Sequence, residues 1–340
     1  MQNRIRGNAL ALAVDVHTHF VPSEFPAPSG RNALWPSIER RGDTAAIVID
    51  GKVFRKIDSR SWDAIRRLDD MGLDDVDAQV VSPMPELLSH WLPAVDADAL
   101  CDHINVRIAA LCAAHPDRFF GMGMVPMQDT SLALRRIADL KALGLKGFEI
   151  GTHINGIPLG AAQLNEIYAA AESSGLMIMV HALHPLGIER MGGRPELAAV
   201  AAFPLETALA AVSLMASGVP ERFPNLRIML SHGGGALSWI LPRLRHAYNI
   251  GPPLSELFPS DPSAAIRRFH YDTILYDASA LRFLADNVGM DQLVAGSDYP
   301  FSIKQDRPVA FSEASLSIPR QILFANAMRL LGIEDASSIQ

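Results

Sequence analysis

Short runs of apolar residues recur along this chain of 340 residues, and most of them end in a polar or glycine-containing turn. Each run is rich in large or β-branched side chains and does not alternate with polar residues. That pattern is typical of strands buried on both faces of a parallel sheet. The eight predicted strands are Leu12–Val16, Ala78–Ser82, Phe119–Val125, Leu145–Ile150, Leu176–Val180, Leu226–Leu230, Ile274–Asp277 and Leu293–Ala295.

Helical stretches lie between these strands. They are Trp62–Met71, Ala97–Ala114, Leu132–Leu143, Ala161–Ser174, Leu205–Ser217, Ala236–Ala247 and Leu281–Asn287. Eight strands that alternate with helices predict an α/β fold, the (β/α)₈ or TIM barrel. A doubly wound open sheet is the alternative, because a count of strands does not show whether the sheet closes.

Two segments extend this minimal barrel. Residues 22–60 separate the first strand from the first helix, and Ala46–Asp50 and Val53–Ile57 flank a glycine turn as a hairpin would. We expect this insertion on the rim of the barrel. Pro319–Leu331 is expected to form an extra helix at the end of the chain. No internal repeat or linker marks a second unit, so residues 1–340 are predicted to form a single domain.

Charge and cysteine content narrow the classes of function. The chain has 30 Lys and Arg against 37 Asp and Glu, a net charge of −7, which argues against nucleic acid as a partner. Cys101 and Cys112 lie on one predicted helix, too far apart for a disulfide, and we expect free thiols and a cytoplasmic location. The apolar run before Asp15 is too short for a signal peptide, and no run of 18 apolar residues predicts a membrane span.

Histidines and one aspartate occupy the ends of several predicted strands. His17 and His19 are two residues apart, so on a strand both side chains point to one face. His181, His232 and Asp298 directly follow the predicted fifth, sixth and eighth strands or their short turns. The carboxyl ends of barrel strands share one rim, where barrel enzymes hold their active sites. Imidazole and carboxylate groups together suit a metal such as zinc.

The remaining histidines lack this placement. His184 lies three residues after His181, and it could either face the pocket or replace a metal ligand. We expect surface or helix positions for His90, His103, His115, His153, His246 and His270.

These motifs carry a resemblance to a known family. The chain resembles the amidohydrolase superfamily, within it the branch of aminocarboxymuconate-semialdehyde decarboxylase and related decarboxylases, from about residue 12 to about residue 332. The matching segments are Val14–Phe20, Gly51–Arg55, Gly151–His153, His181, Ser231–Gly235 and Gly296–Phe301. His-Gly-Gly-Gly together with Gly-Ser-Asp-Tyr-Pro-Phe is far more specific than two histidines alone.

The resemblance implies roles for the polar residues. His17, His19, His181 and Asp298 would hold one divalent metal, most simply Zn²⁺ with Mn²⁺ as the second choice. His232 would remain unligated as a catalytic base, and Asp298 could also shuttle a proton. Two-metal members of the superfamily usually carry a bridging lysine at the end of the fourth strand. Here that end is Phe148–Gly151 and contains no lysine, and Lys146 lies at the start of the strand, so a single metal is expected.

Arginines are the expected substrate ligands, because guanidinium binds carboxylates through two parallel hydrogen bonds. The resemblance assigns Arg55, on the insertion, to a substrate carboxylate. Phe301 is expected to line the pocket, with a place in the core as the alternative. The resemblance also implies a homodimer in which Arg243 reaches the site of the neighbouring subunit. The sequence after His181 reads Ala-Leu-His-Pro, where the named branch has Pro-Trp, so the resemblance does not specify the substrate.

The sequence thus predicts a metal-dependent lyase that removes CO₂ from a small unsaturated or aromatic carboxylic acid during ring catabolism. Either His232 activates a water that attacks the conjugated substrate, or an acid protonates the ring carbon directly. Hydrolysis or hydration of a lactone, amide or conjugated acid is the second hypothesis. A barrel that binds the metal without turnover is the third, and a free base at His232 argues against it.

Overall fold

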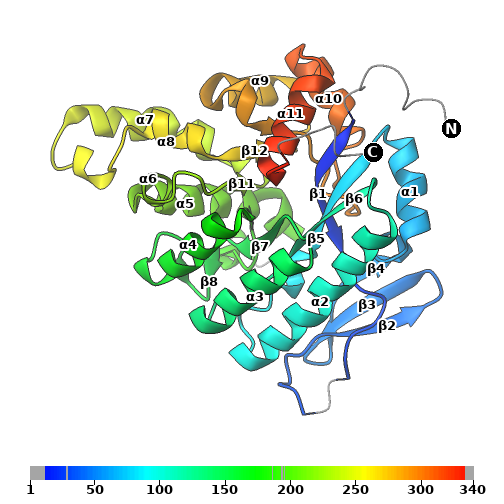
Figure 1. Ribbon diagram of the computed structural model, residues 1–340. Helices are drawn as coiled ribbons and strands as arrows, with labels where there is room; N and C mark the ends of the chain where they lie inside the picture. The colour runs from blue at the N-terminus through cyan, green and yellow to red at the C-terminus, as the bar shows by residue number, and fades with distance from the viewer. Residues whose placement is uncertain (1–11, 28–29, 186, 193, 195, 334–340) are drawn as a thin grey trace.

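The computed structural model describes residues 12–27, 30–185, 187–192, 194 and 196–333. Eight parallel strands form one sheet in which each strand pairs with the next barrel strand along the chain, and helices surround it (Figure 1). The strands are β1 (Val14–Phe20), β5 (Ala78–Pro83), β6 (Phe119–Gly123), β7 (Gly147–Gly151), β10 (Met177–His181), β11 (Ile228–Leu230), β12 (His270–Asp272) and β13 (Leu293–Val294).

The last strand closes onto the first. The backbone N of Val16 donates to the carbonyl of Ala295 at 2.8 Å, and the N of Asp298 donates to the carbonyl of His17 at 2.9 Å. Thr18 and Tyr299 form a further parallel bridge. This closure confirms the (β/α)₈ barrel and excludes the open sheet.

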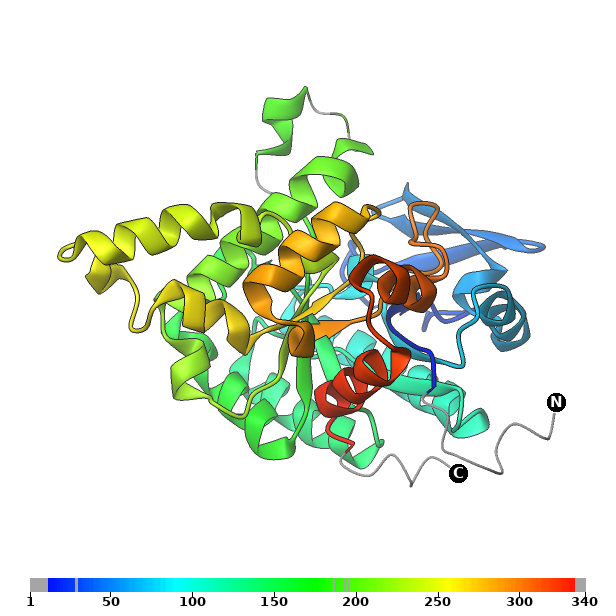
Figure 2. The ribbon, with the colours of Figure 1, turned by 90° about the horizontal axis from the view of Figure 1, so that it is seen from above.

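The outer layer contains all seven predicted helices, with their ends shifted by a few residues. They are α1 (Ala64–Leu73), α2 (Ala94–Ala114), α3 (Thr130–Ala142), α4 (Asn165–Ser174), α5 (Phe203–Ala216), α7 (Leu237–Ile250) and α9 (Ala278–Val288), with the short α6 (Val219–Arg222) and α8 (Pro262–Ala265). Asp63, Asp129 and Asp277 cap α1, α3 and α9, because each side chain accepts hydrogen bonds from N–H groups of the first turn. Figure 2 shows α7 extending outward from the ring of helices.

The predicted seventh strand, Ile274–Asp277, is wrong. The strand lies earlier, at His270–Asp272, and Ile274–Asp277 forms the loop that leads into α9. Tyr276 has a φ of 59°, which a strand does not allow, and the side chain of Asp277 is engaged as the cap of α9. This loop therefore has the apolar composition of a buried strand but not its backbone conformation.

The insertion holds three strands rather than the predicted two. β2 (Ser37–Arg41), β3 (Thr44–Ile49) and β4 (Lys52–Asp58) form a separate antiparallel sheet, coloured medium blue beside the barrel in Figure 1. The predicted hairpin corresponds to β3 and β4. β2 is Ser-Ile-Glu-Arg-Arg, largely polar and exposed, so it lacks the apolar pattern used to find strands. A second small sheet pairs β8 (His153–Ile154) with β9 (Ile157–Pro158).

The base of the barrel is covered by the last helix. Val14, Val16, Met122, Met179 and Met229 pack inside the lumen in one apolar cluster. Ala327, Met328, Leu330 and Leu331 of α11 (Arg320–Leu331) belong to that cluster, so α11 seals the lower end. The predicted C-terminal helix is thus present, and a further helix, α10 (Pro308–Leu316), precedes it.

One segment of the outer layer is unusually apolar. Ala198–Ala216, which combines a π-helical turn (Ala198–Ala202) with α5, has a mean hydropathy of 1.7 over 18 residues, enough in length and composition to cross a membrane. In the barrel 44% of that window is buried. Packing against the barrel therefore accounts for only part of its apolar character. A single helix of this kind is weak evidence for a membrane span.

Candidate metal centre

A β-bulge in β1 allows both histidines of the first strand to face the lumen. Val14 and Val16 point into the apolar lumen, so regular alternation would turn His17 away from it. The register of β1 against β5 shifts between Asp15 and Thr18, however, and His17 and His19 then both point into the upper lumen. A bulge of this kind re-aims side chains next to active sites.

Asp15 stabilises this distorted segment. Its carboxylate accepts hydrogen bonds from the backbone N of His17 at 3.2 Å and from Ser297, through the backbone N at 3.0 Å and Oγ at 2.5 Å. Burial raises the pKa of Asp15 to about 7, although these donors oppose the shift. The same carboxylate thus ties the bulge to the turn that carries Asp298.

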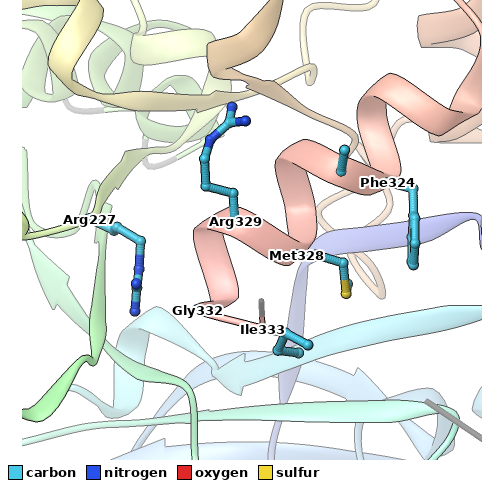
Figure 3. Close-up of a pocket in the computed structure, with 7 residues that line it drawn as sticks. Arg227, Phe324, Met328, Arg329, Gly332 and Ile333 are labelled. Atoms are coloured by element: carbon cyan, nitrogen blue, oxygen red, sulfur yellow. The ribbon is translucent and has the colours of Figure 1, made fainter. Parts of the chain in front are cut away.

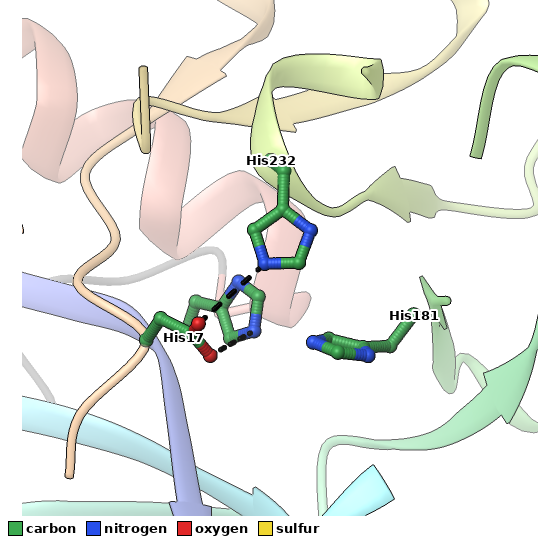
Figure 4. A group of neighbouring side chains, drawn as sticks. His17, His181 and His232 are labelled. Atoms are coloured by element: carbon green, nitrogen blue, oxygen red, sulfur yellow. Dashed lines mark ion pairs between the residues drawn. The ribbon is translucent and has the colours of Figure 1, made fainter. Parts of the chain in front are cut away.

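Four ligand atoms converge at the upper end of the lumen. One nitrogen each from His17, His181 and His232 and one oxygen from Asp298 all lie within 4.8 Å of one another. Figure 4 shows the three imidazoles turned toward one another. His19 completes the group, because its Nε2 is 3.0 Å from both His17 Nε2 and Asp298 Oδ1. The structure therefore brings together all five polar residues that the strand ends predicted.

Hydrogen bonds on the outer side fix the orientation of the three imidazoles expected as ligands. His17 Nδ1 lies 2.6 Å from Asp272 Oδ2, His19 Nδ1 lies 3.0 Å from the carbonyl of Pro83, and His181 Nδ1 lies 2.9 Å from that of Ala182. Each Nδ1 faces an acceptor, and each Nε2 is directed at the shared centre. Metal-binding histidines are held in this way by outer partners.

Asp272 is the residue of this site that the sequence prediction missed. Besides His17, it accepts hydrogen bonds from the backbone N of His232 and of Gly233, both at 2.9 Å. It thereby positions a predicted ligand and the predicted base together. Asp272 is the last residue of β12, so it lies at a strand end like the residues that were predicted. It was missed because the seventh strand was predicted too late in the sequence. Gly296 packs against both His17 and Asp272. A Cβ atom at this position would lie 3.0 Å from the Cβ atoms of these two residues.

The protonation behaviour of the group differs from residue to residue. Burial, with a smaller contribution from His232, holds the pKa of His181 well below its ordinary value. Burial would raise the pKa of Asp298, but the hydrogen bond from His19 and the charge of His232, 3.6 Å away, hold it well below its ordinary value. For His232, burial lowers the pKa and the Asp298 carboxylate more than offsets that effect, so its pKa is raised.

These residues fit a divalent metal. His181 Nε2 is buried and has no hydrogen-bond partner among the described residues, which is costly unless something binds it. A metal binds neutral imidazoles and ionised carboxylates, and the pKa shifts of His181 and Asp298 favour those protonation states. His17, His19, His181 and Asp298 remain the predicted ligands. His232 lies equally close, so its role as an unligated base stays a prediction.

Arg55 and Phe301 lie beside this centre, as the sequence predicted. The Phe301 ring centroid is 5.1 Å from that of His19, and the Arg55 guanidinium lies 4.6 Å above the Phe301 ring. Arg55 also forms an ion pair with Glu86, a residue that the sequence analysis did not single out. Its charge is therefore already balanced within the chain.

His184 and Arg243 lie outside the group of ligand atoms. His184 is exposed, has a φ of 51°, and packs edge-on against Trp91 with the ring centroids 4.7 Å apart. It belongs to the rim and not to the metal group found among the described residues. Arg243 is exposed on α7 and has no ion pair within the described part of the chain.

Comparison with known proteins agrees with this site. Residues 14–333 match the family model described as Amidohydrolase. The chain belongs to this amidohydrolase family. It is 33% identical over 335 residues to the 2-amino-3-carboxymuconate-6-semialdehyde decarboxylase of Dictyostelium discoideum, covering 95% of this chain and 92% of that protein. The resemblance found in the sequence is thus confirmed.

Two solved structures are similar to this amidohydrolase. The 5-carboxyvanillate decarboxylase LigW of Sphingomonas paucimobilis is 27% identical with a TM-score of 0.71, over 81% of this chain and 85% of that one. The second is the dihydroxybenzoic acid decarboxylase of Polaromonas, solved with bound manganese and the inhibitor 2-nitroresorcinol. It has a TM-score of 0.76 at 21% identity, and the match covers 96% of this chain and 99% of that one. At that identity the second likeness supports the fold.

Proposed function

We propose that this amidohydrolase is a metal-dependent, non-oxidative decarboxylase of a small unsaturated or aromatic carboxylic acid. The observation that carries the proposal is the buried group of imidazoles and one carboxylate converging at one end of the barrel. The names of its relatives support decarboxylation, since a 33% identical relative and a 27% identical structure are both decarboxylases.

Each residue of the site has a role in this reaction. His17, His19, His181 and Asp298 would hold the metal, which would supply Lewis-acid chemistry. His232 moves the proton, because its ring lies 3.6 Å from Asp298 and its Nδ1 has no partner among the described residues. Phe301 covers the site on the side of His19 and helps to keep water out.

Release of CO₂ separates this reaction from its alternatives. Hydrolysis or hydration of a lactone, amide or conjugated acid would use the same residues but would not release CO₂, and the relatives do not favour it. We suggest incubating the metal-loaded protein with carboxymuconate semialdehydes and hydroxybenzoates and measuring dissolved CO₂. Turnover without CO₂ would support hydrolysis, and metal binding without any turnover would support a binding module.

Zinc is the proposed metal, with manganese as the alternative. Histidine nitrogens suit zinc well, and the ligand set also accommodates other borderline ions. Manganese is bound in the Polaromonas structure, so both metals need testing. Elemental analysis of the purified protein, followed by removal of the metal and reconstitution with each ion, would identify the metal that restores activity.

A homodimer is the proposed assembly, with Arg243 completing the site of the partner subunit. Leu205, Leu209 and Trp239 on α5 and α7 are large apolar residues with exposed fractions of 56%, 64% and 78%. Arg243 is four residues after Trp239 and so lies on the same face of α7. A two-fold interface through this face buries the apolar residues and offers an unpaired guanidinium to a substrate carboxylate.

Subunit complementation tests this arrangement. Arg243→Ala and His232→Ala should each be inactive as homodimers. After subunit exchange, one of the two sites in a mixed dimer receives both intact residues, so about half of the sites in each heterodimer should become active. Exchange without any recovery of activity would place Arg243 in its own site or outside it.

We also propose a reducing compartment, the cytoplasm, as its location. Cys101 and Cys112 are both free, on α2, and burial raises the pKa of the Cys112 thiol to about 12. Such thiols are inert and persist without oxidation. Fractionation of cells with an antibody to the protein would test the location.

A further inference from the structure

Glu86 occupies an uncommon position between the rim and the metal centre. It lies in the short 3₁₀ turn Pro85–Leu87, which follows the carboxyl end of β5, and its side chain is only 5% exposed. Its Oε1 pairs with Arg55, which lies over Phe301. Its charge also acts on Glu149, whose carboxylate is 3.7 Å from His19. Glu86 is therefore part of the wall of the substrate site.

The second oxygen of Glu86 has no partner. Glu86 Oε2 is buried and accepts no hydrogen bond from any described residue. A buried carboxylate oxygen without a donor is costly, so an atom from outside the protein is needed to satisfy it. Two other titratable groups interact electrostatically with Glu86. Its negative charge raises the pKa of Glu149, and it opposes the effect of burial, which lowers the pKa of His184.

The pair also changes what Arg55 can bind. A free guanidinium attracts a carboxylate, but Arg55 and Glu86 together carry no net charge. A second carboxylate placed here would face the carboxylate of Glu86 across a single guanidinium. A neutral group with an N–H or O–H could instead donate to Oε2 and accept from Arg55.

We propose that Glu86 determines substrate specificity: its free Oε2 accepts a hydrogen bond from a hydroxyl or amino group of the substrate, and its charge excludes a second carboxylate from the Arg55 end of the site. This proposal rests on the proposed function and narrows it. The substrate class becomes a monocarboxylic acid that carries a hydroxyl or amino group distant from the carboxyl group that leaves. Glu86 thus works both by attraction and by rejection.

Binding of three matched, unreactive probes tests the proposal without requiring turnover. We suggest titrating the metal-loaded protein with benzoate, 3-hydroxybenzoate and benzene-1,3-dicarboxylate by calorimetry. The wild-type protein should prefer 3-hydroxybenzoate and bind the dicarboxylate most weakly. In Glu86→Gln the dissociation constant of the dicarboxylate, divided by that of 3-hydroxybenzoate, should fall by roughly 10- to 100-fold, the range for a hydrogen bond to a charged group.

A matched control separates this effect from general loss of an ion pair. Asp98 forms ion pairs with Arg135 and Arg136 on the outer helices α2 and α3, and its side chain is also largely buried, at 12% exposed. Asp98→Asn should lower stability and leave the ratio of dissociation constants unchanged. An unchanged ratio in Glu86→Gln, or a wild-type protein that does not distinguish the three probes, overturns the proposal.

A second comparison covers the case in which Glu86→Gln does not fold. Arg55→Gln leaves the negative charge of Glu86 without its ion-pair partner. The double variant, Arg55→Gln with Glu86→Gln, removes both charges. The double variant should bind the dicarboxylate at least about tenfold more tightly than Arg55→Gln does; equal affinity overturns the proposal. Because no turnover is measured, a shift in the ratio without CO₂ release from any acid refutes the decarboxylase and retains the role of Glu86.

Discussion

Both ends of the barrel lumen carry polar residues, yet among the described residues only those at the upper end bring ligand atoms together. At the upper end, ligand atoms of His17, His181, His232 and Asp298 lie within 4.8 Å of one another. At the base, Arg227 donates to the carbonyl of Gly175 at 2.5 Å, so its guanidinium is engaged with the protein itself. The comparison teaches that convergence of polar atoms, and not their presence alone, distinguishes a site.

The base does contain a pocket of about 500 Å³. It is lined by Arg227, Phe324, Ala325, Met328, Arg329, Gly332 and Ile333, and Figure 3 shows these residues around the end of α11. Its floor is mainly apolar, and Arg329 donates to the carbonyl of Asp291 and to Asn326. No group of metal-ligating side chains forms there among the described residues. We therefore regard the base as structural.

Loss of a predicted ligand should have the largest effect on the upper end. His17→Ala removes an imidazole from the centre and takes away one of the hydrogen-bond partners of Asp272. The purified variant should contain little metal and have no measurable activity, and chelation of the wild-type metal should do the same. Elemental analysis beside a CO₂ assay makes the measurement, and an unchanged metal content would contradict the ligand assignment.

His232→Ala should separate chemistry from metal binding. If His232 is a base and not a ligand, the metal should stay while turnover falls by about 10²–10⁴-fold, the usual contribution of a general base. His115→Ala, at the end of α2, is the control and should change neither quantity. A metal-free His232→Ala protein would show that His232 is a ligand.

Asp272→Asn should have a smaller effect, because it alters the orientation of His17 and not the ligand itself. An amide can keep the shape of the contact but not its charge. Metal affinity should fall by about 10- to 100-fold, as is typical for outer partners of ligands. Competition with a chelator of known affinity measures it, and addition of excess metal should restore activity.

The base should respond in stability and not in chemistry. Met328→Ala removes a buried side chain of α11 from the lumen cluster, and should lower the free energy of unfolding by about 2–5 kcal/mol. Metal content and turnover per folded molecule should stay unchanged. Chemical denaturation and elemental analysis of the same sample check both, and a loss of metal would show that the two ends are coupled.

The smallest expected effect concerns His270, at the start of β12. Burial and the nearby Arg329 and Arg227 lower its pKa to about 4. Between pH 6.5 and about 4 the unfolded chain binds a proton that the folded chain does not, so its contribution to stability falls as the pH falls through this window. His270→Asn should lose this part of the acid sensitivity. Unfolding curves of both proteins from pH 7 to pH 4.5 make the comparison, and parallel curves would contradict it.

Burial also explains how much of the barrel and of its upper site could be predicted from the sequence. The barrel strands, apart from the seventh, were visible because strands buried on both faces are short apolar runs. His17, His19, His181, His232 and Asp298 were visible because they stand in or directly after such runs. The polar strand β2 was not predicted, since it is largely polar and exposed and has no apolar run.

Contacts between distant segments account for the remaining errors. Asp272 belongs to the site only because β12 ends there, and a loop of similar composition follows it. Glu86 has no motif of its own, and its role depends on Arg55 reaching across from another sheet. The bulge in β1 likewise depends on pairing with β5, which no local pattern records.

Closure of the barrel has a consequence for synthesis of the protein. His19 and Asp298 are separated by 279 positions, and they meet only when the last strand pairs with the first. A nascent chain on the ribosome therefore has no complete metal centre until almost all of its barrel has been translated. With His19 and Asp298 as the predicted ligands, metal capture would mark the end of folding, and the bound ion would stabilise the closed ring against reopening at the seam between β13 and β1.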